Sequence, residues 1–392
     1  MIKVLVVFGT RPEAIKMAPL VLEMKKFPNL IHPMVCVTGQ HRDMLDQVLT
    51  IFEIVPDYDL EIMKPNQDLF DIFTNTMIGM RDVLTKTKPD FVLVHGDTST
   101  SSAAALSAFY FKIPVGHVEA GLRTYERYNP WPEEINRQMN SKISTFHFAP
   151  TQSSAQNLRK ELVSEESIVV TGNTVIDALK IADQKISDLL KTNALFFKDY
   201  FPKISMDTIE KWISGDRKMV LITAHRRENF GEGFKNIFQA INELVDEFPQ
   251  VDFVFPLHLN PKVREAANEI FGDGRANVTN LFFEEPMGYL SFVFLLRYSH
   301  LVLTDSGGIQ EEAPGFGKPV LVLRDTTERP EAVESGTVIL VGTDSKKIKE
   351  SVSLLINDSK AYQSMSHAIN PYGDGLASSR IVSKILEISS TS

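Results

Sequence analysis

Short apolar runs alternate with amphipathic segments of helix length along the whole chain. In the first half the apolar runs predict strands, namely IKVLVVF, MVCVTG, FVLVHGD, PVGHVEA, FHFAP and SIVVTG. Between them lie helical patterns such as EAIKMAPLVLEMKKF, SSAAALSAFYF and QSSAQNLRKEL. Strands that alternate with helices predict a parallel sheet, and strands that are apolar throughout indicate that helices cover both of its faces.

The second half repeats this architecture. Its predicted strands are MVLITAHRREN, VDFVFPLHL, VTNLFF, HLVLTD, KPVLVLRD and TVILVGTD. The helical stretch TGNTVIDALKIADQKI and the less regular KTNALFFKDYFPKISMD separate the two sets. A chain of 392 residues is too long for one ordinary core. We therefore expect an α/β protein of two Rossmann-like parallel-sheet domains, with a boundary near Gly172–Ile181 and a last helix after Asn370-Pro371-Tyr372-Gly373.

The amino-acid composition argues against some kinds of binding partner and some cellular locations. The net charge of -9 argues against nucleic acid and against an anionic membrane. Cys36 is the one cysteine, which excludes a disulfide within the chain and fits a reducing compartment. The N-terminal apolar run is too short for a signal peptide, and the stretch FVFLLRYSHLVL is interrupted by Arg297 and His300. We expect a soluble, cytoplasmic protein.

Polar clusters follow the predicted strands at their carboxyl ends, where open parallel sheets bind ligands. They are GTRPEAIK with Arg11 and Lys16, TGQHRD with Gln40 and His41, HGDTST with Asp97, HVEAGLRT with Glu119, TAHRREN with His225, and TDSGG with Ser306. Because both sheets carry such clusters, we expect the two domains to face each other across a ligand-binding cleft.

The stretch from Ser306 to Arg329 has the composition of a nucleotide site. The Ser306-Gly307-Gly308 turn offers bare backbone N–H groups before a helix, which suits a diphosphate, although a tight strand-to-helix connection would need the same glycines. Glu312, one turn deeper, could accept both hydroxyls of a ribose, with Arg329 near phosphate or sugar. Met287 and Phe292 could flank a base, although Phe292 taken by itself fits a plain buried helix better.

Two nucleotide-binding motifs are absent from the sequence. No GxxxxGK[ST] is present, which disfavours a P-loop, and VFGTRPEA stands where a dinucleotide fold would carry GxGxxG. The histidines show no metal-ligand spacing. We expect neither a cofactor nor a metal.

Three carboxylates of the first domain, Asp97, Glu119 and Glu133, are candidates for acid–base chemistry. Each has a structural alternative. Asp97 could cap a helix, Glu119 could pair with Arg123, and Glu133 could be a helix-opening acid in NPWPEEINR. His225 could contact a phosphate or leaving group, or belong to a solvated basic turn.

Together the motifs resemble the non-hydrolysing UDP-N-acetylglucosamine 2-epimerases of bacteria. The resemblance rests, in order along nearly the whole chain, on GTRPEAIKMAPL, TGQHRDMLDQV, VHGDT, HVEAGLRT, PWPEEINR, TGNTVIDAL, AHRREN, PLHLNP, TDSGGIQEEAP, GKPVLVLRDTTERPEA, GTVILVGTD and NPYGDG. It implies the GT-B arrangement of two Rossmann-like domains. Residues 1–172 with 372–392 would form the N-terminal catalytic domain, and residues 173–371 the UDP-binding domain.

The resemblance also implies site residues and partners. The catalytic group would be Asp97, Glu119, Glu133 and His225. Substrate contacts would come from Arg11, Lys16, Arg137, Met287, Phe292, Ser306, Gly307, Gly308, Glu312 and Arg329. A second, activating substrate site would draw on Gln40, His41, Gln67 and His258. The partners would be UDP-N-acetylglucosamine, UDP-N-acetylmannosamine, UDP and a second copy of the chain in a homodimer, and the product would feed surface polysaccharide synthesis.

The chemistry favours one route for such a reaction. No carbonyl lies beside C2 of the sugar to stabilise a carbanion, and oxidation at C3 would need a nicotinamide that this sequence has no fingerprint to bind. Expelling UDP from C1 while C2 loses its proton would give 2-acetamidoglucal, and re-addition with the proton on the other face would invert C2. Three alternatives stay open: a UDP-diacetamido uronic acid as substrate, a GT-B glycosyltransferase, and a nucleotide-sugar sensor.

Overall fold

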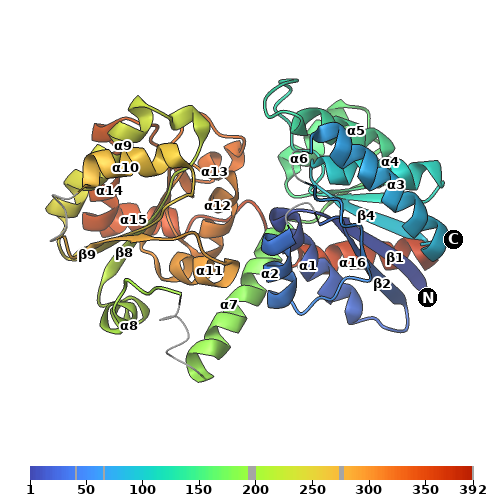
Figure 1. Cartoon of the computed structure of the whole chain (residues 1–392), viewed down its shortest axis with the longest axis horizontal. Coiled ribbons are helices and arrows are strands. Elements are labelled where there is room, and N and C mark those ends of the chain that lie inside the picture. The colour runs from blue at the N-terminus through green and yellow to red at the C-terminus, as the bar shows by residue number, and fades with distance from the viewer. Residues whose placement is uncertain (40–41, 65–66, 193–199, 273–277, 391–392) are drawn as a thin grey trace. The chain divides into compact units, whose positions relative to one another are not determined.

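The computed structural model describes residues 1–39, 42–64, 67–192, 200–272 and 278–390. The chain divides into two compact units, the first made of Met1–Ile181 with Tyr372–Ser392 and the second of Ala182–Pro371. Each contains one parallel sheet covered by helices (Figure 1). The predicted fold class, two Rossmann-like parallel-sheet domains, is confirmed.

In the part of the chain that is described, the N-terminal unit has a seven-stranded sheet of order β3-β2-β1-β4-β5-β6-β7. Its strands are β1 Ile2–Phe8, β2 Ile31–Val37, β3 Tyr58–Asp59, β4 Phe91–His95, β5 Val115–Val118, β6 Phe146–Ala149 and β7 Ile168–Val170. Every pairing is parallel. The central strands are buried along their whole length, so their unbroken apolar runs follow from helices on both faces.

Several helices of this unit begin at a side chain that caps them. The helices are α1 Arg11–Lys25, α2 Arg42–Ile51, α3 Leu69–Thr87, α4 Ser99–Tyr110, α5 Glu133–Ile143, α6 Gln152–Lys160, α16 Ala377–Ser390 and the first part of α7 Thr174–Thr192, which continues into the second unit. Thr10 and Glu13 form a capping box at α1, and Thr98 caps α4. Because these caps follow β1 and β4 directly, they fix the loops at the carboxyl ends of those strands.

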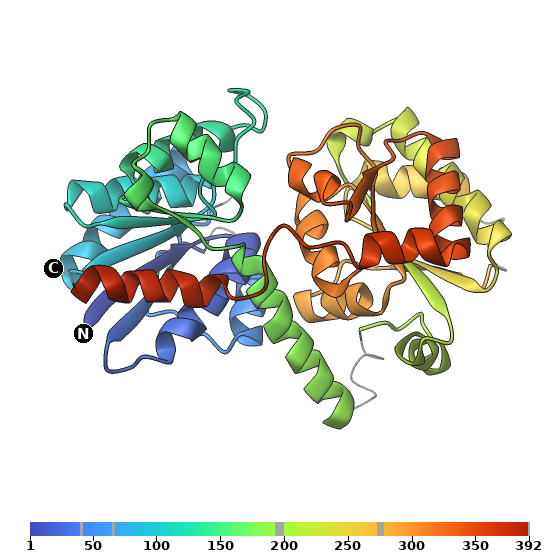
Figure 2. The same cartoon turned by 180° about the vertical axis from the view of Figure 1, so that it is seen from behind.

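The C-terminal segment completes the N-terminal unit. Helix α16 packs beside α1, as seen from behind in Figure 2. The carboxylate of Asp177 in α7 accepts hydrogen bonds from the backbone N–H of Ala377 and of Ser378, at 3.2 and 2.8 Å. The first turn of α16 is thereby anchored to a segment 200 residues earlier in the chain.

The C-terminal unit has, among its described residues, a six-stranded sheet of order β10-β9-β8-β11-β12-β13 with every pairing parallel. The strands are β8 Lys218–Thr223, β9 Val251–Pro256, β10 Leu281–Glu284, β11 Leu301–Thr304, β12 Val320–Val322 and β13 Val338–Leu340. The helices are α8 Met206–Ser214, α9 Glu232–Glu247, α10 Pro261–Phe271, α11 Tyr289–Tyr298, α12 Gly307–Glu312, α13 Pro330–Glu334, α14 Ser345–Asn357 and α15 Ser359–Ser366. None of the helices described in either unit has the length and apolar character needed to cross a membrane.

Candidate active site

The carboxyl edge of the N-terminal sheet brings Glu119 and Lys16 together, although 103 residues separate them. The Lys16 ammonium forms an ion pair with the Glu119 carboxylate, and both side chains are about nine-tenths buried. Asn173 Nδ2 donates to the same carboxylate at 2.7 Å. The side chain of His95, at the end of β4, has its Nε2 atom 3.7 Å from Glu119 Oε1. The alternative pairing of Glu119 with Arg123 is not found, because Arg123 binds Glu161 instead.

The backbone of Glu119 is in the left-handed region, with φ of 64°. That conformation costs a non-glycine residue about 1–2 kcal/mol and persists where surrounding contacts hold it. Here the contacts are the ion pair with Lys16 and the hydrogen bond from Asn173. Strain held at a strand end is typical of functional sites.

Asp97 lies on the loop after β4 and is held by α5. Arg137 Nε donates to its carboxylate at 2.8 Å, and Asn136 Nδ2 donates to its backbone carbonyl at 2.8 Å. Its side chain remains 24% exposed, so it can reach a ligand. The helix cap of α4 is Thr98 and not Asp97, which removes the structural alternative for this carboxylate.

Two neighbouring acids open α5, and their surroundings differ. Glu134 is fully buried and accepts hydrogen bonds from the backbone N–H groups of Thr124 and Tyr125 at 3.0 and 3.2 Å. Burial alone would raise the pKa of Glu134, but these donors together with Gln138 and Arg137 outweigh it and lower the pKa. Glu134 therefore supports the loop before the helix, and Glu133, at the first helical position, remains the predicted catalytic residue of the two.

Two histidines lie beneath these loops as buried neutral groups. Burial lowers the pKa of His95 to about 4 and that of His117 to about 3. His117 Nε2 donates to the carbonyl of Gly96 at 2.7 Å, directly before Asp97. Within the described ranges no group of three or more His, Cys, Asp or Glu side chains could hold a metal ion.

In the C-terminal unit, the carboxyl ends of β8 and β11 bring His225 close to Asp305, which the sequence analysis did not select. Asp305 is fully buried. Its Oδ2 accepts from the backbone N–H groups of His225 and Arg226 at 2.8 and 2.7 Å, and from Asn229 Nδ2 at 3.3 Å. Its Oδ1 lies 3.2 Å from Nδ1 of the His225 ring. The sequence feature that could have identified Asp305 is its position directly before the Ser-Gly-Gly turn.

The Ser306-Gly307-Gly308 turn and Arg329 also meet in this unit. Ser306 is the N-cap of the six-residue helix α12. A Cβ added at Gly307 would lie 3.0 Å from the Arg329 guanidinium, so the guanidinium packs against the turn. Glu311, with one of its oxygens 2.9 Å from Arg329 Nε and 2.9 Å from Nη2, orients it. Sequence reasoning missed Glu311 as the partner of this arginine.

The remaining predicted residues lie in or directly beside the first or last turn of a helix. Arg11 opens α1, Glu312 closes α12, Met287 precedes α11, and Phe292 lies in the first turn of α11 and is partly buried. Their contacts with a nucleotide sugar stay predictions.

The predicted second site is only partly described, because Gln40 and His41 lie outside the described residues. Gln67 accepts a hydrogen bond from the backbone N–H of Lys64. The His258 ring stacks on the His225 ring, with centroids 5.3 Å apart and planes 17° from parallel. Burial, followed by the neighbouring His225, lowers the pKa of His258.

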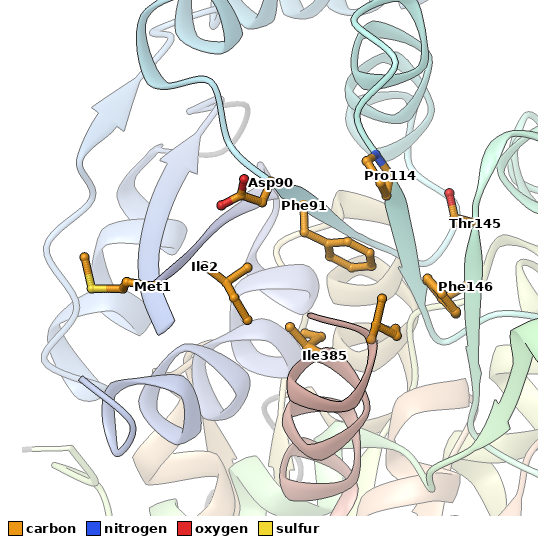
Figure 3. A pocket seen from close by; sticks show the side chains of 9 residues that line it. Met1, Ile2, Asp90, Phe91, Pro114, Thr145, Phe146 and Ile385 are labelled. Carbon is orange, nitrogen blue, oxygen red and sulfur yellow. The ribbon is translucent and has the colours of Figure 1, made fainter. Parts of the chain in front are cut away.

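A cavity of about 550 Å³ lies at the other edge of the N-terminal sheet, where β1, β4 and β6 begin. Figure 3 shows apolar side chains lining it, with Ile385 contributed by α16. Its lining residues are Met1, Ile2, Asp90, Phe91, Pro114, Thr145, Phe146, Ile385 and Ile388, and none of them is a predicted site residue. This cavity therefore belongs to none of the predicted sites.

Known proteins are similar to this chain along nearly its whole length. The family model described as UDP-N-acetylglucosamine 2-epimerase matches residues 23–386. A UDP-N-acetylglucosamine 2-epimerase of Neisseria meningitidis serogroup A is 54% identical over 385 residues, which cover 98% of this chain and 99% of the relative. The crystal structure of the Neisseria meningitidis UDP-GlcNAc 2-epimerase bound to UDP-GlcNAc has a TM-score of 0.87 at 54% identity, covering 98% and 100% of the two chains. The Methanocaldococcus jannaschii UDP-GlcNAc 2-epimerase in complex with UDP-GlcNAc and UDP has a TM-score of 0.75 at 34% identity, with the same coverage.

Proposed function

The chain belongs to the UDP-N-acetylglucosamine 2-epimerase family and is an isomerase, and from that premise we propose that it interconverts UDP-N-acetylglucosamine and UDP-N-acetylmannosamine by elimination and re-addition of UDP. The observation that carries the proposal is the pair of acids at the carboxyl edge of the N-terminal sheet. Glu119 is strained and ion-paired, and Asp97 is held by Arg137 on the neighbouring loop. Both loops are close, since a Cβ at Gly96, beside Asp97, would lie 3.7 Å from Glu119 Oε1.

In the proposed first half-reaction a carboxylate abstracts the proton from C2. The C2–H electron pair forms the C1=C2 double bond of 2-acetamidoglucal, and the C1–O bond breaks with its electron pair passing to the departing diphosphate. The second half-reaction reverses these steps with the proton delivered to the opposite face of C2. No electrons are gained or lost overall, so the reaction needs general acids and bases. The candidates are Asp97, Glu119 and Glu133.

The C-terminal unit would support the departing UDP. The turn at Ser306–Gly308, Arg329 and His225 are suited to a diphosphate because they combine backbone N–H groups with side chains that can carry positive charge. Arg329 packs against Gly307, which supports a shared role for the turn and the guanidinium. Glu312, Met287 and Phe292 would contact ribose and base, and Arg11, Lys16 and Arg137 the sugar diphosphate from the N-terminal unit.

Proton NMR of UDP-N-acetylglucosamine in D2O, with no nicotinamide added, tests this proposal. We expect UDP-N-acetylmannosamine that carries deuterium at C2. Free UDP with free N-acetylmannosamine would show a hydrolysing enzyme, and product that keeps its C2 proton would contradict exchange with solvent through a carboxylate. The variant Asp97→Asn keeps the size of the side chain and should keep UDP binding while turnover falls about 10²–10⁴-fold.

We also propose that the chain acts as a homodimer. Helices α3 and α4 pack against each other and carry exposed apolar side chains, including Phe70 at 82%, Phe109 at 57% and Tyr110 at 65% exposure. Exposed aromatic groups of this kind mark association surfaces. In light scattering after gel filtration, Phe109→Ser with Tyr110→Ser should give the monomer mass. Leu162→Ser, at a 92% exposed position elsewhere, is the control that should leave the dimer intact. A monomeric unaltered protein would refute the proposal.

Three further parts of the proposal rest on the family resemblance. A second substrate site with Gln40, His41, Gln67 and His258 would activate the enzyme, so the initial rate should depend sigmoidally on UDP-N-acetylglucosamine and become hyperbolic in Gln67→Ala. The product would supply surface polysaccharide synthesis, and deleting the gene should then remove sugars derived from N-acetylmannosamine from the cell surface. The enzyme would act in the cytoplasm, which cell fractionation tests; its one cysteine, Cys36, is buried and forms no disulfide.

A further inference from the structure

We propose that Asp305 is a positioning residue for His225, holding the imidazole so that Nδ1 is a hydrogen-bond donor and Nε2 is left to serve the departing diphosphate. This inference rests on the proposed function, since His225 is assigned there to the leaving group. It concerns a residue that the sequence motifs did not select, and it rests on the surroundings of one buried carboxylate.

The two oxygens of Asp305 have different surroundings. Oδ2 accepts from three N–H groups, two of the backbone at His225 and Arg226 and one of the Asn229 amide. Oδ1 is fully buried and accepts no hydrogen bond from the described residues, while the Nδ1 atom of His225 lies 3.2 Å away, within ion-pair distance. A buried acceptor of this kind is costly unless a donor reaches it. The His225 ring is therefore the group placed to satisfy Oδ1 once its N–H turns toward that oxygen.

Asp305 is held as an anion. Burial by itself would raise the pKa of its carboxyl, but the donors from His225 and Arg226 outweigh burial and lower the pKa. An ionised carboxylate only accepts hydrogen bonds. Nδ1 of His225 must therefore carry a proton, which in the neutral ring leaves the lone pair on Nε2 and in the charged ring puts a second proton there.

The other titratable neighbour supports the same arrangement. His258 stacks on His225, and its Nδ1 accepts from the backbone N–H of Asn260 at 3.1 Å. A ring whose Nδ1 accepts a hydrogen bond is not doubly protonated, so the His258 ring that stacks on His225 is uncharged. The charged residues that follow His225 in the chain are Arg226, Arg227 and Glu228, of which Glu228 pairs with Arg324. Asp305 is the carboxylate within ion-pair distance of the His225 ring.

This arrangement gives His225 a defined task. With the diphosphate bound, Nε2 takes up a proton from solvent. When the C1–O bond breaks and its electron pair moves to the diphosphate, this Nε2–H donates a hydrogen bond to the phosphate oxygen. Asp305 stabilises the positive ring at that moment without itself touching the substrate. In re-addition the same N–H holds UDP until C1 is attacked.

A purely structural role for Asp305 makes a different prediction. By accepting from His225 and Arg226, the carboxylate also joins the loops after β8 and β11. The variant Asp305→Asn separates the two roles. Its amide oxygen can replace Oδ2 and keep all three donors, while its NH₂ group faces Nδ1 of His225 and donates to it. That forces the ring into the neutral tautomer with the proton on Nε2.

Nitrogen-15 NMR of protein labelled in histidine reads the tautomer directly, with His225→Gln assigning the signals. We expect the Nδ1–H tautomer of His225 in the unaltered protein and the Nε2–H tautomer in Asp305→Asn. We expect kcat of Asp305→Asn to fall about a hundredfold or more with KM changed less than about threefold. Asn229→Ala removes a donor to Oδ2 but leaves the ring contact, so it should lower the melting temperature and keep both tautomer and kcat.

The outcomes separate this proposal from the proposed function. An unchanged tautomer in Asp305→Asn, or a changed tautomer with kcat preserved, overturns the role of Asp305. If Asp305→Asn does not fold, the spectrum of the unaltered protein decides, since an Nε2–H tautomer there contradicts the geometry. A protein with the expected tautomers that does not epimerise UDP-N-acetylglucosamine would refute the proposed function alone.

Discussion

Acid should destabilise this protein steeply because it contains buried neutral histidines, of which His117 is the clearest. Burial lowers the pKa of His117 from its ordinary value of 6.5 to about 3, and its Nε2 donates to the Gly96 carbonyl. Below pH 6.5 the unfolded chain binds a proton that the folded chain refuses, so the free energy of unfolding falls as the pH falls. The stability is fully present above pH 6.5 and is lost progressively down to about pH 3.

The magnitude follows from the shift. Each unit of pKa difference corresponds to about 1.36 kcal/mol, and between pH 7 and pH 5 one such histidine removes about 2 kcal/mol from the free energy of unfolding. Burial also lowers the pKa of His95, His147 and His300 to about 4. His95, His117 and His147 belong to the N-terminal unit and together should remove about 5–6 kcal/mol from its free energy of unfolding over the same interval, which is comparable to the whole stability of a typical small domain. His300 should remove about 2 kcal/mol from the free energy of unfolding of the C-terminal unit.

Urea unfolding followed by circular dichroism at pH 7 and at pH 5 measures this effect, analysed as two transitions for the two units. His117→Gln keeps a donor in place of Nε2 but cannot be protonated. Its loss of stability between pH 7 and pH 5 should be about 2 kcal/mol smaller than that of the unaltered protein. His32→Gln, at an exposed position, should lose as much as the unaltered protein. Equal losses in His117→Gln and the unaltered protein would refute the reasoning.

Two further substitutions test contacts in each unit. Gly307→Ala would place a Cβ 3.0 Å from the Arg329 guanidinium and should raise KM roughly tenfold. Gly233→Ala, outside the predicted site and with its nearest atom at 3.4 Å, should leave KM close to its unaltered value, and equal KM values for the two variants would contradict a role for Arg329 at the turn. Arg123→Met removes a fully buried guanidinium bound to Glu161 through Nε and Nη2, and should lower the free energy of unfolding by about 3–5 kcal/mol in urea titrations. Arg159→Met, which breaks an exposed pair with Glu165, should not move the urea midpoint, and a similar shift in both variants would count against burial as the cause.

The sequence predicted the sheets well because their signal is local. Each predicted strand overlaps an observed strand, and the caps at Thr10 and Thr98 lie where polar residues follow such strands. The two-residue strand β3, Tyr58–Asp59, was not predicted because two residues carry no periodicity. Helix α8, Met206–Ser214, begins at the end of the stretch that the sequence analysis found less regular, and it was not predicted.

The partners of the polar side chains were less predictable, because they depend on contacts between distant segments. Lys16 meets Glu119 across 103 residues and Asp305 meets His225 across 80. Glu119 lies close to Arg123 in the sequence, yet the Arg123 guanidinium binds Glu161, which is 38 residues further along the chain. In each case the neighbouring strand order, and not the spacing along the chain, decides which side chains meet.

The return of the last helix has a consequence for how the polypeptide is made. The N-terminal unit consists of residues on both sides of the C-terminal unit, and its two segments touch where the Asn173 N–H donates to the Tyr372 carbonyl at 2.7 Å. On the ribosome, residues 1–181 emerge first but wait for α16 until nearly the whole chain has been translated. The inserted unit, Ala182–Pro371, is contiguous and can finish folding earlier. Once folded, it brings the ends of a long loop together and reduces the entropy cost of docking α16. A released chain truncated after Pro371 would therefore expose an incomplete first unit beside a complete second one, a state open to chaperones and proteases.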